Sequence, residues 1–148
     1  MATFIISGSR GTDDSTMATL PFMAAKVAKE QGHEVVLWLW NEAVTLGRKG
    51  TADHVTGVNL TPLKDLLAAV QAANIPIWVC GACAVARQIG AGDLVSRARR
   101  SRACRTTSRP WPNVTATWHS DSASKEGVSI WQPMASRPGS QKAAGSTG

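Results

Sequence analysis

The stretch Asn74-Ile75-Pro76-Ile77-Trp78-Val79-Cys80-Gly81-Ala82-Cys83 joins an apolar run directly to a Cys-x-x-Cys pair. The run over residues 74–79 predicts a strand, and residues 84–89 predict a helix. Two thiols therefore stand where a strand passes into a helix. Amide dipoles at a helix start stabilise a thiolate, so a cysteine at this place can have a depressed pKa and act as a nucleophile.

The chain before this corner alternates strands with helices. Further strands are predicted over residues 2–7 and 33–40, helices over residues 16–31 and 41–46 and from residue 61, and a long loop over residues 48–59. This alternation indicates an α/β domain with a mostly parallel sheet. Asn41 and Glu42 follow the second strand, so they would face the same sheet edge as Cys80, the usual ligand side. An N-cap role for these two residues fits equally well.

The basic charge lies entirely in the last third of the chain. Residues 1–95 carry seven Lys or Arg and eight Asp or Glu, a net charge of −1, whereas residues 96–148 carry nine and two, a net charge of +7. The second segment has no apolar periodicity, so it cannot bury enough surface to offset its conformational entropy. We therefore expect one domain over residues 1–95 and a disordered, basic, low-complexity tail over residues 96–148. Its charge would bind nucleic acid without specificity.

The sequence also indicates where in the cell the protein is expected. No apolar run approaches the roughly 20 residues that cross a bilayer, and the first residues lack the pattern of a signal peptide. A cytoplasmic protein with no membrane partner is therefore expected. Three cysteines, an odd number, do not suggest a disulfide framework.

The order of short motifs along residues 1–95 resembles the DsrE/DsrF-like family of small sulfur-relay proteins, especially its YchN-like branch. The first strand with its Ser/Gly turn is followed by Gly32-His33-Glu34-Val35, Asn41-Glu42-Ala43-Val44, Gly57-Val58-Asn59-Leu60, Ile75-Pro76-Ile77-Trp78-Val79-Cys80-Gly81-Ala82-Cys83, Arg87-Gln88-Ile89 and Asp93-Leu94-Val95. The family commonly has a glycine after the arginine, where this chain has Gln88.

The resemblance implies a flavodoxin-like, three-layer fold that assembles into homo-trimers or hexamers, without a cofactor or metal. It also implies that Cys80 carries sulfane sulfur as a persulfide, taken from a donor protein and passed to an acceptor protein by transpersulfidation. Cys83, one turn on, would be a resolving or assisting thiol. By their positions in the chain, Asn41 and Glu42 at the end of the second strand and Arg87, one helical turn beyond Cys83, are candidates to line the site. Such a protein is a sulfurtransferase-like carrier, and whether it acts as an enzyme stays open.

Family members continue beyond this point with a helix and a last strand, a pattern that residues 96–148 do not show. The fold is therefore expected to lack its last strand. Reading the codons from Val95 onward at their third base permits a family-like helix in place of residues 106–112. It also permits a strand ending at a stop codon in place of residues 118–121. Our hypothesis is that the tail is translated out of frame, and resequencing the gene would refute it by finding unrelated in-frame codons there.

Three other interpretations of the cysteines remain. A zinc site from Cys80, Cys83, Cys104 and His119 is disfavoured because only the first pair has ligand spacing. A thioredoxin-like redox protein also has Cys-x-x-Cys before a helix, but here the motif follows the third strand and no matching cis-proline segment is evident. The third is a non-catalytic ligand-binding or structural oligomer whose cysteines pack as small hydrophobes.

Overall fold

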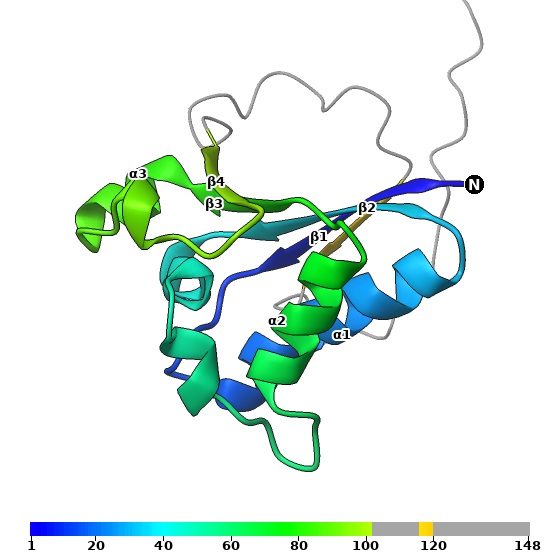
Figure 1. Cartoon of the computed structure of the whole chain (residues 1–148), viewed down its shortest axis with the longest axis horizontal. Helices are drawn as coiled ribbons and strands as arrows, with labels where there is room; N and C mark the ends of the chain where they lie inside the picture. The colour runs from blue at the N-terminus through cyan, green and yellow to red at the C-terminus, as the bar shows by residue number, and fades with distance from the viewer. Residues whose placement is uncertain (102–115, 120–148) are drawn as a thin grey trace, which may run out of the picture.

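The computed structural model describes residues 1–101 and 116–119, which build a five-stranded sheet (Figure 1). All the strand pairs are parallel, in the order β4-β3-β2-β1-β5. The strands are β1 (Thr3–Gly8), β2 (Glu34–Leu39), β3 (Ile77–Cys80), β4 (Ala98–Ser101) and β5 (Ala116–His119). The α/β class with a parallel sheet is thus confirmed.

Two longer helices, α1 (Ser15–Glu30) and α2 (Leu63–Ala72), pack on one face of the sheet (Figure 1). The carboxylate of Asp14 starts α1 by accepting a hydrogen bond of 3.0 Å from the amide of Met17. Gly32, with a φ of 83°, ends it in the left-handed conformation that glycine adopts without strain. Each end of this helix lies within one residue of the predicted range, 16–31. No helix in the part of the chain that the structure describes is long and apolar enough to span a bilayer.

The core lies between this helical layer and the sheet. Alternate residues of β2, Val35, Leu37 and Leu39, are buried, whereas Val36 and Trp38 between them are only partly buried. The largest fully buried side chains include Phe22 of α1, Leu63 and Val70 of α2, and Ile77 and Val79 of β3. The sheet and one helical layer of the expected three-layer arrangement are therefore present in residues 1–101 and 116–119.

The remaining helices are short. They are the 3₁₀ helices η1 (Asn41–Gly47), η2 (Thr51–His54) and η3 (Ala91–Asp93), and α3 (Gly81–Ala86). The helix expected over residues 41–46 is therefore a 3₁₀ helix, and the expected loop over residues 48–59 contains η2. Helix α3 ends three residues earlier than predicted, because Gln88 takes a φ of 54° and turns the chain away. Helix α2 begins at Leu63, two residues later than predicted, with Pro62 at its N-cap.

Two expectations for the tail are wrong. Residues 98–101 form β4, which pairs with β3, and residues 116–119 form β5, which pairs with β1, so neither segment is disordered and the sheet has a further strand. Edge strands are held by backbone hydrogen bonds and tolerate charged side chains. Because Arg99 and Arg100 are exposed, β4 has no apolar periodicity that would predict a strand. The disorder expected over residues 102–115 and 120–148, and Cys104 within it, lie outside the described residues.

Candidate functional site

Parallel strand ends bring the cysteine corner and the start of η1 together. Helix α3 follows β3 and η1 follows β2, and these two strands are neighbours in the sheet. The amide of Trp40 donates to Gly8 O at 3.0 Å and that of Ala43 donates to Ser9 O at 3.1 Å, so the end of β1 fixes η1. The carboxyl ends of β1, β2 and β3 thus lie at one edge of the sheet. This is the edge at which the sequence predicted Asn41, Glu42 and Cys80 to lie together.

The two thiols of the corner differ in exposure. Cys80 is the last residue of β3 and the N-cap of α3, and it is 0% exposed. Cys83 lies one turn later and is partly exposed at the end of the sheet. Both are free thiols.

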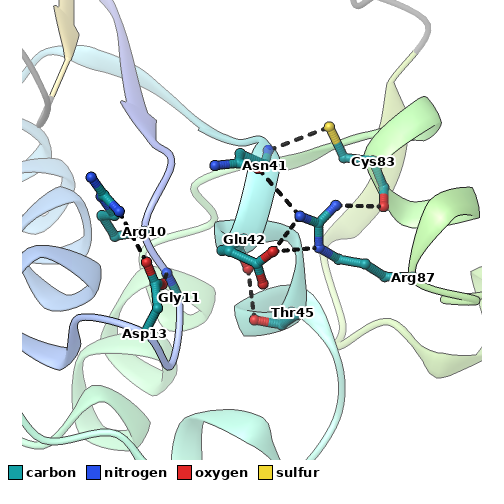
Figure 2. A network of polar contacts seen from close by, with 8 residues as sticks. All are labelled: Arg10, Gly11, Asp13, Asn41, Glu42, Thr45, Cys83 and Arg87. Carbon is teal, nitrogen blue, oxygen red and sulfur yellow. Dashed lines mark hydrogen bonds and ion pairs between the residues drawn. The ribbon is translucent and has the colours of Figure 1, made fainter.

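The amide of Asn41 reaches the outer thiol. It donates a hydrogen bond of 3.3 Å to the Sγ atom of Cys83 (Figure 2). Asn41 has a φ of 50°, in the left-handed region that asparagine tolerates better than most residues with a side chain. This backbone conformation aims an amide, rather than a side chain, at the sulfur.

Arg87 ties α3 to η1 around that contact (Figure 2). Its Nη1 atom donates to the carbonyl of Cys83 at 3.2 Å, and its Nη2 atom donates to Oδ1 of Asn41 at 3.2 Å. Its Nε atom donates to Oε1 of Glu42 at 3.1 Å, and Nη2 forms an ion pair with the same oxygen. One guanidinium therefore contacts Asn41, Glu42 and the backbone of Cys83.

The pKa of Cys83 is raised, whereas the sequence suggested a depressed one. Burial and a hydrogen bond with the neighbouring Cys80 thiol raise the pKa of Cys83, while the Asn41 amide and the positive charge of Arg87 act in the opposite direction without prevailing. The expectation of a depressed pKa is therefore wrong for Cys83. Burial is the largest of these influences on Cys83, which lies in the six-residue helix α3.

The glycine turn after β1 packs against the back of η1. A Cβ atom on Gly11 would lie 2.6 Å from the carbonyl oxygen of Glu42 and 2.8 Å from Oγ1 of Thr45, so this contact needs a glycine. The Gly11 amide donates to Oδ1 of Asp13 at 2.7 Å, and Arg10 forms an ion pair with Asp13 at 3.2 Å (Figure 2). The amide is thus engaged by a carboxylate, as in an ordinary turn rather than an anion cradle.

Away from the cysteines, the described residues offer no metal site and line a surface hollow. Among residues 1–101 and 116–119 there is no group of three His, Cys, Asp or Glu that could hold a metal ion. A surface hollow of about 370 Å³ is lined by Asn74, Pro76, Arg97, Ala98 and Arg99, at the amino ends of β3 and β4. It lies at the opposite end of the strands from the cysteines.

Sequence reasoning missed two backbone features of the site. Asn41 acts through its amide as well as its side chain, and Gln88 stands in the left-handed conformation at the end of α3. The only sequence signal for the role of the Asn41 amide was an asparagine directly after a strand. Gln88 stands where the resembled family commonly has a glycine, and its positive φ explains that preference, because glycine takes such a φ without strain.

The comparisons with known proteins give a family model and a similar fold. The model of the DsrE/DsrF-like family matches residues 1–103. The crystal structure of the YchN protein from E. coli has a similar fold, with a TM-score of 0.62 over 80% of this chain and 99% of that chain at 20% sequence identity. No curated protein sequence matches the chain. Because the family model covers more than half of its residues, the chain belongs to the DsrE/DsrF-like family.

Proposed function

We propose that this protein is a sulfur-relay protein that carries sulfane sulfur as a persulfide on the Cys80–Cys83 pair. Its family is generally linked to sulfur relay. The observation that supports the proposal is a pair of free thiols one turn apart, whose outer member contacts the Asn41 amide inside the Arg87 network. Cys80 is the expected final carrier, and Asn41, Glu42 and Arg87 line the site.

The pair can perform transpersulfidation without a cofactor. A thiolate attacks the outer sulfur of a donor persulfide, the donor's S–S bond breaks, and the donor leaves as a thiolate that takes up a proton. The sulfur is then held on the protein until an acceptor thiolate attacks it in the same way. On this proposal the protein works in the cytoplasm as a homo-oligomer, between a sulfur donor protein and an acceptor protein.

The burial of Cys80 argues against a thioredoxin-like function. A nucleophilic cysteine that reduces protein disulfides must meet a bulky partner, and reactive cysteines are partly exposed. The first cysteine of this pair is 0% exposed. A purely structural role for the cysteines stays the other alternative, and the test below separates it from sulfur relay.

The test is sulfur uptake by the reduced, full-length protein. After incubation with glutathione persulfide, we expect the intact mass to rise by one sulfur atom, and we expect a thiol acceptor to remove that sulfur. Changing Cys80 and Cys83 together to serine should abolish the uptake, whereas Cys104→Ser, outside the corner, serves as the matched control and should load normally. Equal masses before and after incubation of the native protein would contradict sulfur relay.

A further inference from the structure

The two thiols differ in burial. Cys80 belongs to the buried core around Val79 and Ala84, with 0% exposure. Cys83 packs against that core but is partly exposed. A donor persulfide has to place its outer sulfur in line with the attacking thiolate, so it needs access to the sulfur atom itself. In the folded protein, Cys83 offers that access and Cys80 does not.

The polar contacts of the corner also gather at the outer thiol. The Asn41 amide points at the Sγ atom of Cys83 from 3.3 Å, a position from which it stabilises negative charge on that sulfur or on a sulfur bonded to it. Arg87 donates to the carbonyl of Cys83 at 3.2 Å, which places a positive charge beside the same residue. Both of these contacts are made to Cys83.

We propose that sulfane sulfur is first accepted by Cys83 and reaches Cys80 only from Cys83. This inference rests on the proposed sulfur-relay function and assigns an order to its two thiols. Cys83 is then the residue that meets donor and acceptor proteins, and Cys80 is the inner residue that holds the sulfur away from solvent.

The internal step is chemically balanced. The Cys80 thiolate attacks the outer sulfur of the Cys83 persulfide, a new S–S bond forms on Cys80, and the bond between that sulfur and Cys83 breaks. Cys83 leaves as a thiolate and takes the proton that Cys80 gave up, so there is no net oxidation. Attack on the inner sulfur would instead release hydrogen sulfide and leave a disulfide between Cys80 and Cys83.

The spacing of the thiols suits this transfer. Residues three apart at a helix start lie on the same side of the first turn, and Cys80 is the N-cap of α3. The raised pKa of Cys83, to which the neighbouring Cys80 thiol contributes, agrees with this placement.

The experiment compares single variants of the full-length protein with glutathione persulfide as the probe. Samples are stopped at short times with an alkylating reagent, and the extra sulfur is located by peptide mass spectrometry, which also reads Cys104 separately. Cys80→Ser should accept sulfur on Cys83 but should not retain it as the native protein does. Cys83→Ser should load Cys80 at least about tenfold more slowly than the native protein loads its pair, because access to the sulfur is lost.

A second measurement needs no sulfur donor. In the folded native protein, N-ethylmaleimide should label Cys83 at least about tenfold faster than Cys80, and in denaturant the two rates should become similar. This comparison uses one unmodified chain, so a folding defect in a variant cannot produce the result.

The outcomes are distinct. If the native protein loads sulfur and Cys83→Ser loads Cys80 equally fast, the order proposed here is wrong and sulfur relay stands. If the native protein takes up no sulfur, the proposed function fails and the order fails with it. Faster labelling of Cys80 than of Cys83 in the folded protein would overturn the order whatever the function.

Discussion

At the scale of single residues, Arg87 has the widest reach in the site. It contacts Glu42, 45 positions earlier in the sequence, and also Asn41 and the carbonyl of Cys83. Glu42 raises the pKa of Arg87 in return, so the guanidinium keeps its charge throughout the range in which thiols titrate. Its position between η1 and α3 makes it a positioning residue that acts on the outer thiol through both segments.

This role predicts a pH effect. Because the thiolate is the form that reacts with iodoacetamide, a raised pKa moves the midpoint of alkylation to higher pH. The midpoint for native Cys83 should lie above the ordinary thiol value of about 8.5. Arg87→Gln, which keeps a polar side chain without the charge, should move it higher still, since the charge of Arg87 favours the thiolate.

The measurement is the alkylation rate of Cys83 between neutral and alkaline pH, read by peptide mass spectrometry. Arg10→Gln is the matched control, because Arg10 pairs with Asp13 in the turn after β1 and makes no contact with Cys83 in the described network. A midpoint that Arg87→Gln leaves in place would mean that Arg87 holds the two segments without influencing the thiol.

At the scale of elements, the end of α3 combines a favourable hydrogen-bond pattern with a strained residue. The amide of Ile89 donates to Ala84 O at 2.9 Å and that of Gln88 donates to Val85 O at 3.0 Å, the paired bonds that close a helix through a left-handed residue. Glycine usually occupies that place, as Gly32 does after α1. Here Gln88 occupies it with a φ of 54°.

Gln88→Gly should therefore stabilise the protein by about 1 kcal/mol, because it removes the steric cost of a Cβ atom in the left-handed region. Gln31→Gly is the matched control. Gln31 is the C-cap of α1 with a φ of −79°, so glycine brings no relief there and only adds freedom to the unfolded chain. Urea unfolding midpoints of the two variants and the native protein decide the matter, and equal midpoints for both variants would contradict the strain at Gln88.

The elements that the sequence predicted well are those with a dense apolar pattern. Strands β1, β2 and β3 and helix α1 have core-facing residues at regular spacing, and the parallel topology then placed Asn41 and Glu42 beside the cysteine corner. The direction of the pKa shift at Cys83 was beyond such reasoning, because it depends on how deeply the thiol is buried and on its contact with Cys80. The separate exposures of the two cysteines depend on packing in the same way.

At the scale of the whole molecule, β5 forms one edge of the sheet and covers the outer side of β1. It pairs with β1 from Phe4 opposite Ala116 to Ser7 opposite His119. Without β5, the backbone groups along this side of β1 would be open to other chains, which is a common route to association. The sequence could not reveal β5, because a four-residue strand within a polar segment has no periodicity to distinguish it from a loop.

A chain ending at residue 103, the last residue that the family model matches, should therefore be less stable than a chain ending at residue 121, which keeps β5. It should also associate, because it leaves the outer side of β1 unpaired. Urea unfolding and light scattering at equal protein concentration measure the two effects. If both shortened chains unfold at the same midpoint and stay equally dispersed, the pairing of β5 with β1 contributes nothing to the fold.

The strand order also determines when each strand can pair during synthesis of the chain. Strands β1 to β4 are added in sequence toward one edge, whereas the partner on the other side of β1 arrives only with residues 116–119. Strand β1 therefore has no second neighbour until more than a hundred further residues have been made. Pairings so distant in sequence form slowly. The newly made chain therefore keeps one side of β1 unpaired until β5 has been made and has docked.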